Sequence, residues 1–234
     1  MNSISNFIIS LFLLGSVSLA FAAPIAYIPL GSGNEVIAVD AANNKIIKRY
    51  PVIENPHGLV ATPDGEYLIA GSLKETLVPA GSSADTPNST LYVVHLQHGH
   101  VMSEIPVSGW THHEAITPDG KFVISTHPTR GGISVVDLGN NKVFKIIKTG
   151  PSPNYTLVAK DGKHAYVSNT GNATISEIDV AKWEVVRTLE AGPSPEHIVF
   201  SPDEKTIYVS NDRAGTVSVV SRQSGKIEKN YKIG

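Results

Sequence analysis

AYIPLGSGNEVIAVD, at residues 26–40, returns in register and without a gap as AYVSNTGNATISEID at residues 165–179. A second marker, an aspartate in a Gly-containing or charged turn, recurs with a regular spacing. It stands at Asp64, Asp119, Asp161 and Asp203, and the last three are 42 residues apart. A fixed period of this length is the sequence signature of a repeat architecture.

The unit at residues 131–170 shows what each repeat contains. Segments 132–138, 143–148, 155–158 and 164–168 are rich in β-branched residues, and Gly, Asn or Pro residues separate them. These segments predict four short antiparallel strands and no helix. We therefore predict an all-β fold, a β-propeller of four-stranded antiparallel blades with a repeat of about 42 residues, in which stacked blades form the core.

One repeat carries an insertion. The first two turn aspartates, Asp64 and Asp119, are 55 residues apart, which places 13 extra residues between Ser72 and Asn88. The segment PAGSSADTP at 79–87 has the composition of an exposed loop. It is either a neutral insertion or a loop that binds a partner or ligand.

Short motifs in these repeats carry a family resemblance. YVSNT at 166–170 and YVSND at 208–212 resemble the YVTN-type β-propeller repeat, and PHGLVATPDG at 56–65 resembles its innermost strand and turn. The resemblance extends over nearly all of residues 26–234. It implies kinship with surface-layer and periplasmic binding propellers, lactonase-like propellers and the propeller domain of cytochrome cd-type nitrite reductases.

The number of repeats is smaller than this resemblance implies. The sequence has five copies of the first two strands and four of the innermost strand, whereas the resembling family usually has seven blades. We expect about five blades of a seven-bladed ring, incomplete at its C-terminal side. The chain is then a fragment, a naturally truncated product, or one of two chains that complete a ring together.

The N-terminal 22 residues differ from the rest. Residues 7–21 are almost wholly apolar, and Ala20-Phe21-Ala22 has the small residues of a cleavage site, although no Lys or Arg comes before them. We predict a signal peptide at 1–22, a propeller at 23–234 and a periplasmic or secreted location. The alternative is an uncleaved membrane anchor. No second apolar stretch predicts a membrane span after signal removal.

Composition excludes several functions. The formal net charge is −2 and 17% of residues are charged, so the sequence has no basic footprint for nucleic acid. It contains no cysteine and no Gly-x-Ser-x-Gly motif. A catalytic nucleophile is therefore not visible, and whether the protein is an enzyme stays open, with binding favoured.

The repeat register points to candidate ligand-binding residues. The innermost strands of a propeller line its channel, and two equivalent positions lie seven and six residues before each turn aspartate. In three of the four repeats both positions are polar or aromatic. The candidates are His57, His112, Asn154 and Glu196 at the first position, and His113, Tyr155 and His197 at the second.

Imidazole groups near one axis could bind copper, zinc, iron or a haem iron. Neighbouring residues of a regular strand point to opposite faces, so we expect one ligand per blade rather than His112 and His113 together. The alternative is that these side chains hydrogen-bond to strand ends and channel water. The metal candidates are His57, His112, His113, His127 and His197.

Three further histidines are expected elsewhere. His95, His98 and His100 fall in the hairpin turn at the outer part of a blade. A solvated turn and a surface metal site are the two interpretations.

These observations lead to one functional hypothesis with two alternatives. We expect an exported binding or scaffold propeller that recognises a small molecule or a protein at the channel mouth. The resemblance adds a metal- or haem-associated redox or cofactor-assembly propeller, and a lactonase-like hydrolase.

Overall fold

The computed structural model of the protein describes residues 24–51 and 53–233, and the predicted signal peptide lies outside this range. Its strands form five antiparallel sheets, which we call blades 1 to 5.

Blade 1 contains β1 (Ile25–Leu30), β2 (Glu35–Asp40) and β3 (Lys45–Pro51). Blade 2 contains β4 (Pro56–Ala61), β5 (Tyr67–Ser72), β6 (Ser89–His95) and β7 (His100–Val107). Blade 3 contains β8 (Glu114–Ile116), β9 (Phe122–His127), β10 (Gly132–Asp137) and β11 (Lys142–Lys148). Blade 4 contains β12 (Pro153–Val158), β13 (His164–Asn169), β14 (Thr174–Asp179) and β15 (Glu184–Glu190). Blade 5 contains β16 (Pro195–Phe200), β17 (Thr206–Asn211), β18 (Thr216–Ser221) and β19 (Ile227–Lys232).

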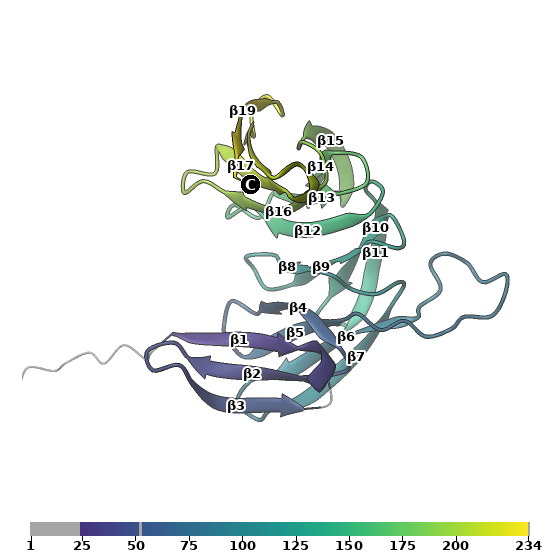
Figure 1. Cartoon of the computed structure of the whole chain (residues 1–234). Coiled ribbons are helices and arrows are strands. Elements are labelled where there is room, and N and C mark those ends of the chain that lie inside the picture. Colours follow the sequence, from purple (N-terminus) through teal and green to yellow (C-terminus); the bar gives the residue numbers. More distant parts are fainter. Residues whose placement is uncertain (1–23, 52, 234) are drawn as a thin grey trace, which may run out of the picture.

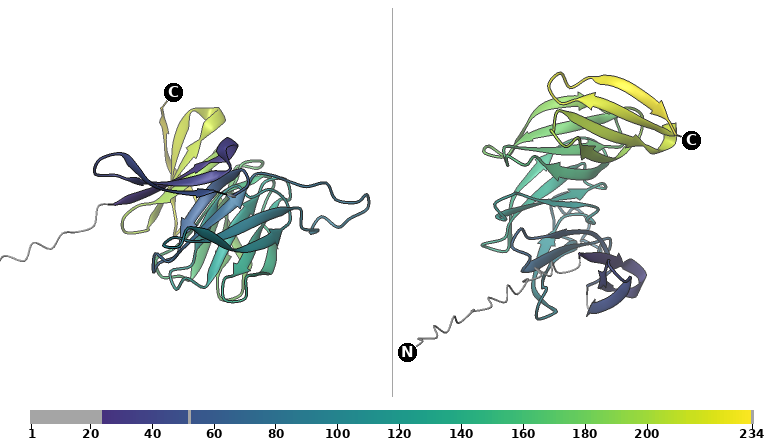
Figure 2. Two further views of the ribbon diagram at one scale, coloured as in Figure 1. Left: turned by 90° about the horizontal axis from the view of Figure 1, so that it is seen from below. Right: turned by 90° about the vertical axis from the view of Figure 1, so that its left-hand side faces the viewer.

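The blades follow one another along an arc, with blade 1 at one end and blade 5 at the other (Figure 1). The inner strands β4, β8, β12 and β16 pack against one another in that order, and β1 packs against β4. Two further views show the same succession of sheets (Figure 2). The prediction of an all-β propeller with about five blades is thus confirmed, as a portion of a propeller ring.

The predicted start of the repeat was wrong. The sequence pattern predicts one blade at residues 131–170, but β10 and β11 complete blade 3, while β12 and β13 begin blade 4. Sequence periodicity reveals the length of a repeat but not its first residue. The blade boundary is decided by which strands share hydrogen bonds across a sheet.

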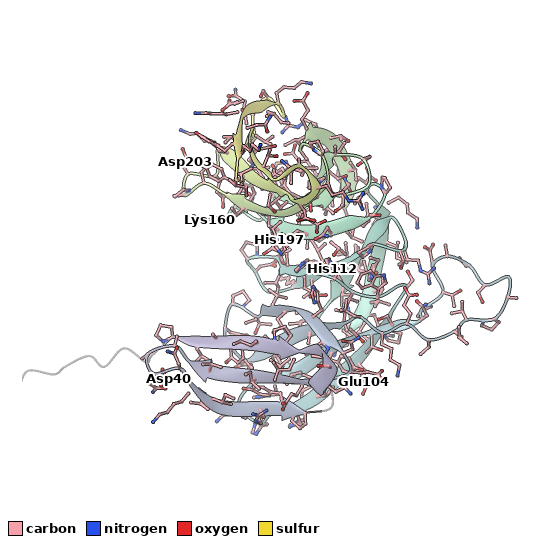
Figure 3. The ribbon with its side chains drawn as sticks, in the orientation of Figure 1. Asp40, Glu104, His112, Lys160, His197 and Asp203 are labelled. Carbon is pink, nitrogen blue, oxygen red and sulfur yellow. The ribbon has the colours of Figure 1, made fainter. Side chains whose placement is uncertain are left out.

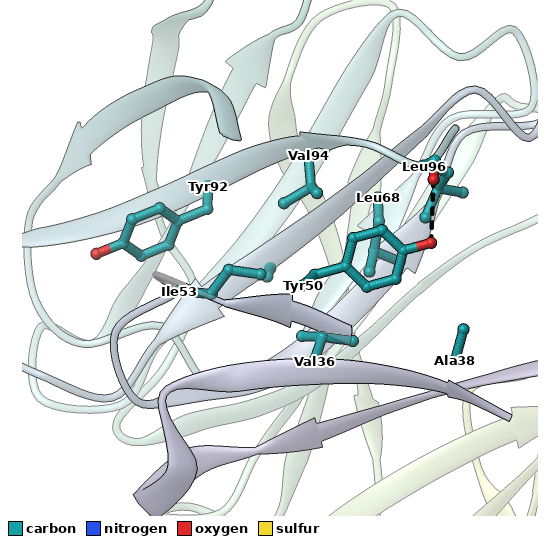
Figure 4. Packing of buried hydrophobic residues seen from close by; sticks show 9 residues of the cluster. Val36, Ala38, Tyr50, Ile53, Leu68, Tyr92, Val94 and Leu96 are labelled. Carbon is teal, nitrogen blue, oxygen red and sulfur yellow. Dashed lines mark hydrogen bonds between the residues drawn. The ribbon is translucent and has the colours of Figure 1, made fainter. Parts of the chain in front are cut away.

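Each pair of neighbouring blades encloses its own hydrophobic cluster. Between blades 1 and 2, Val36, Ile53 and Leu68 are at most 1% exposed, and the Tyr50 hydroxyl donates a hydrogen bond to Leu96 O at 3.1 Å (Figure 4). Burying one such aliphatic side chain contributes roughly 1.5–3 kcal/mol, so stacking of blades stabilises the arc.

The repeated aspartates are turn residues, as expected. The Asp64 carboxylate accepts hydrogen bonds from the Thr62 hydroxyl at 2.5 Å and the Glu66 N–H at 3.0 Å. Asp119 repeats this pattern with the Thr117 hydroxyl at 2.6 Å. These hydrogen bonds lower the pKa of both carboxyl groups and hold them ionised.

The insertion joins β5 to β6 without forming a strand. Its residues 74–85 are exposed, and the loop projects away from the blades at the right of Figure 1. Within the described residues, no helix is long and apolar enough to span a membrane.

Candidate functional site

A β-bulge at the start of each inner strand positions the candidate residues. In blade 4, Pro153 pairs with Asn169 and Thr156 pairs with Val167, so Asn154 and Tyr155 both lie opposite Ser168. Two residues facing one break the alternation of side chains and re-aim them. Blades 2 and 5 show the same shift of register, at His57–Gly58 and at Glu196–His197.

In blade 3, the expectation that the adjacent His112 and His113 point to opposite faces of a strand was wrong. The His112 N–H donates to Thr126 O and the Thr126 N–H donates to His113 O, both at 3.0 Å, so both histidines lie opposite Thr126. Regular strand β8 begins only at Glu114. The two side chains are therefore not forced to opposite faces, and both join one cluster.

Hydroxyl residues hold three of these bulges in place. Each accepts a hydrogen bond from the second bulge residue, as Thr126 Oγ1 does from the His113 N–H at 3.1 Å. Thr126 then donates to Asn154 O in the next blade at 2.6 Å. Sequence reasoning missed this role, although its signal was a hydroxyl residue with a 42-residue spacing, at Thr126, Ser168 and Ser210.

Three imidazoles converge at the inner ends of blades 2 and 3. One ring nitrogen from each of His57, His112 and His113 lies within 4.8 Å of the others. The rings of His57 and His112 are stacked with centroids 4.7 Å apart, and the His113 ring meets the His112 ring edge-on at 4.5 Å. We call these residues the histidine cluster. All three are half-buried.

Two aromatic side chains of blades 4 and 5 extend this cluster. The ring centroid of His113 lies 4.7 Å from that of Tyr155 and 5.0 Å from that of His197. His112 and His197 lie in the middle of the arc, near the inner strands, whereas Asp40 and Asp203 lie toward its two ends (Figure 3). Side chains of four consecutive blades thus meet at the histidine cluster and its two aromatic neighbours.

Burial keeps the cluster uncharged at neutral pH. Loss of water contact, reinforced by the neighbouring histidines, lowers the pKa of His112 to about 4 and that of His113 to about 3. The pKa of His57 is also lowered, first by burial and then by His197. A neutral imidazole has a free nitrogen lone pair, so the histidines can bind a metal ion without first losing a proton. The buried Nδ1 of His112 has no hydrogen-bond partner among the described residues.

Asn154 and Glu196 form a separate pair. The Asn154 side-chain amide donates a hydrogen bond to a Glu196 carboxylate oxygen. Burial, followed by the nearby Asp212, raises the pKa of Glu196. Among the described residues, the metal-ligand group of three contains neither of them.

His127 occupies a structural position apart from the histidine cluster. It is 1% exposed, its Nδ1–H donates to Trp110 O at 3.2 Å, and its Nε2 accepts the Ser134 hydroxyl at 2.9 Å. The side-chain amide of the equivalent Asn169 donates a hydrogen bond to the Ser176 hydroxyl at 3.0 Å. We therefore leave His127 out of the proposed ligand set.

The second group of histidines lies in a turn, as expected. His95 ends β6 and His100 begins β7, while His98 is exposed between them. The His98 N–H donates to Nδ1 of His95 at 3.3 Å. This contact already uses one ring nitrogen.

A buried carboxyl group that sequence reasoning missed lies directly after the cluster. Glu114 Oε1 accepts a hydrogen bond from the Ser125 hydroxyl at 3.2 Å, and Oε2 has no partner within the described residues. Complete burial raises the Glu114 pKa to about 8. Two glycines, Gly58 and Gly71, leave the space that this side chain fills. The two glycines and Glu114 come together only in the folded protein, so the sequence alone does not reveal this buried carboxyl site.

Glu114 is expected to make stability fall as pH rises. Its pKa is higher in the folded than in the unfolded protein, so its contribution is fully present below pH 4.5 and is lost as pH rises through about 8. Within that window the free energy of unfolding should fall by roughly 1 kcal/mol per pH unit from this group alone. Thermal unfolding of wild type and Glu114→Gln, compared from pH 6 to 9, measures the difference. Parallel curves for the two proteins would contradict this assignment.

The family of the chain follows from its repeats. A family model described as "YNCE-like beta-propeller" matches residues 115–234. The chain belongs to the YNCE-like β-propeller family. The match to this family includes Asn154, Tyr155, Glu196 and His197 but begins after the histidine cluster.

Solved structures support the same fold for this YNCE-like propeller. Hydrazine synthase of Kuenenia stuttgartiensis is 22% identical with a TM-score of 0.71, over 92% of this chain and 68% of that chain. Dihydro-heme d1 dehydrogenase NirN in complex with DHE is 19% identical with a TM-score of 0.69, over 92% of this chain and 46% of that chain. No curated protein sequence matches the chain. At these identities the similarity shows the fold alone.

Proposed function

We propose that this YNCE-like propeller is an exported binding protein whose histidine cluster binds a transition-metal ion. The observation that carries this proposal is the convergence of ring nitrogens from His57, His112 and His113 within 4.8 Å. Export is inferred from the signal-like residues 1–22 and implies a periplasmic or secreted location.

The donor set favours particular metals. Imidazole nitrogen suits zinc, copper, nickel and iron, whereas calcium and magnesium prefer oxygen ligands. A tetrahedral zinc site places its nitrogens about 2.0–2.1 Å from the ion, so small side-chain rotations must bring the three rings closer together.

The histidine cluster supplies three ligands, which leaves one position of a tetrahedral metal ion open. A metal with three protein ligands typically keeps its fourth position for water or a substrate. Tyr155 and His197 both contact His113, so they can contact a ligand held there. This arrangement supports binding of a small molecule through the metal.

A cobalt titration tests the proposal. We expect one Co²⁺ per chain to bind the purified protein at pH 7.5, with visible absorption bands of low-coordinate cobalt, because three neutral imidazoles converge there. Zn²⁺ should displace it. Isothermal titration calorimetry gives the stoichiometry, and absorption gives the ligand geometry.

Matched variants separate the cluster from the surface turn. A chain with both His98→Ala and His100→Ala should still bind one Co²⁺ with the same spectrum. A protein that binds no Co²⁺, or that loses it in this control, would contradict the proposal. The haem alternative has its own outcome, since a Soret band that appears on haem addition and persists in Zn²⁺-loaded protein would favour it.

A further inference from the structure

In most blades, a cationic side chain on the outermost strand donates hydrogen bonds to backbone carbonyls of the next blade. In blade 1, Lys48 Nζ donates hydrogen bonds to Leu96 O at 2.8 Å and to Gln97 O at 2.5 Å. These two carbonyls belong to the turn between β6 and β7 of blade 2. Lys48 pairs across the sheet with Ala38, immediately before a β-bulge.

The same tie recurs at the equivalent register position of blades 3 and 4. Lys145 Nζ donates to Lys182 O in blade 4 at 3.2 Å. Arg187 donates to two carbonyls of the blade 5 turn, at 2.8 and 2.6 Å. A charged donor thus satisfies turn carbonyls at three of the four contacts between blades.

Blade 2 lacks this cation. Its equivalent residue is Ser103, which pairs with Val93 just before the bulge in that blade. The matching carbonyls of blade 3 belong to Leu138 and Gly139. Within residues 24–51 and 53–233, no hydrogen bond ends on either of these oxygens.

The contact between blades 2 and 3 also lacks a buried aromatic side chain that is present between blades 3 and 4. In the turn between β14 and β15, Trp183 is 5% exposed and packs edge-on against Phe122 of blade 3, with ring centroids 5.3 Å apart. The equivalent turn residue of blade 3 is Asn141, and the equivalent of Phe122 is Tyr67 in blade 2. Both turn residues have a left-handed backbone, with φ of 55° at Trp183 and 51° at Asn141.

A cavity of about 540 Å³ lies at this contact between blades 2 and 3, and Asn141, at the position of the absent indole, is one of its lining residues. Tyr67, Val93, Met102 and Leu138 supply apolar lining, and the charged residues Asp64, Asp119 and Lys121 also line it. Lys121 forms an ion pair with Asp119 at 3.5 Å, which leaves Asp64 as the carboxylate without a cation in this lining. This volume is typical of small-molecule sites. The cavity is distinct from the histidine cluster, because none of its lining residues belongs to that cluster.

We propose that this cavity binds a small organic amine with an aromatic body. Its ammonium group replaces the missing Lys48 equivalent by donating to Leu138 O and Gly139 O, with the Asp64 carboxylate supplying opposite charge. Its ring replaces the Trp183 equivalent by packing on Tyr67. The proposed ligand thus places an ammonium group and a ring between blades 2 and 3, where Lys145 and Trp183 place theirs between blades 3 and 4.

Tryptamine is the probe, because it joins an indole to a primary ammonium. Calorimetric titration of the purified protein should show tryptamine binding about tenfold more tightly than indole, since a hydrogen bond to a charged donor is stronger than one to a neutral group. Indole-3-propionate has a negative charge and should bind more weakly than both. Equal binding of all three compounds would overturn the proposal.

Two substitutions should fill the cavity from within the chain. Ser103→Lys supplies the missing ammonium, and Asn141→Trp supplies the missing indole. Each should weaken tryptamine binding by about tenfold or more while leaving the protein folded, because each copies a contact found between other blades. Asn44→Trp is the matched control, since Asn44 has the same left-handed turn position in blade 1 but lies outside the cavity.

The outcomes are distinct. Loss of tryptamine binding in either filling variant, with binding kept in the Asn44→Trp control, supports the site. No binding to the wild type, or unchanged binding in both filling variants, overturns it. If one filling variant fails to fold, the other still decides the question.

Discussion

Replacing His112 by alanine is expected to weaken Co²⁺ binding by about 100-fold or more, since loss of even an outer-shell partner of a metal typically weakens binding 10- to 100-fold. His112 is the central member of the histidine cluster. Its ring contacts both His57 and His113, with centroids 4.7 and 4.5 Å away. Removing it leaves two imidazoles and a gap between them. Calorimetry and the cobalt absorption spectrum measure the loss.

His164→Ala is the matched control for this substitution. His164 is half-buried like the cluster histidines but begins β13, and it is not a member of the cluster. Its removal should leave Co²⁺ affinity unchanged. His197→Ala should have an intermediate effect, because His197 contacts His113 without belonging to the group of three. A larger loss in His164→Ala than in His112→Ala would rule out the cluster as the metal site.

Gly58→Ala is expected to destabilise the protein by about 3 kcal/mol, the upper part of the usual range for overpacking. A Cβ at Gly58 would lie 1.8 Å from Glu114 Oε2 and 2.6 Å from the backbone oxygen of His112. The carboxyl group can rotate away, but the backbone oxygen belongs to the bulge that positions the histidine cluster. The midpoint of thermal unfolding should fall by about 10 °C for a domain of this size.

Gly33→Ala provides a matched glycine control. The nearest atom to its added Cβ is Leu30 Cβ at 3.4 Å, so the methyl group meets ordinary contact distances. Its effect should stay within about 0.5 kcal/mol. Combining Gly58→Ala with Glu114→Ala should recover only part of the lost stability, since the contact with His112 O remains. Equal melting temperatures for the two single glycine variants would refute the close approach.

Periodicity was sufficient to predict the propeller. The aspartates at 119, 161 and 203 repeat at 42 residues because each lies in the same tight turn, and that turn depends only on residues close in sequence. The same register picked out positions on β4, β12 and β16, and in blade 3 the two residues directly before β8. It could not show where a blade begins, because hydrogen bonds between strands decide which strands share a sheet.

The candidate site was predicted in part. The repeat register identified His57, His112 and His113 as candidates, but His112 and His113 lie just before strand β8, and regular strand geometry wrongly separated them. A bulge at this point depends on the partner strand, where Thr126 bonds to both histidines. Pairing between strands, rather than the local sequence, therefore decides which imidazoles meet.

The sequence by itself determined the all-β repeat, the turn aspartates and the polar positions on the inner strands, since these follow from local propensity and fixed spacing. Only the tertiary structure decided what fills the space between blades. Glu114 fits because Gly58 and Gly71 lack side chains, and the cavity between blades 2 and 3 is lined by Asn141 where blade 4 has the bulky Trp183. The filling of space depends on residues of neighbouring blades, which are tens of positions apart in the sequence.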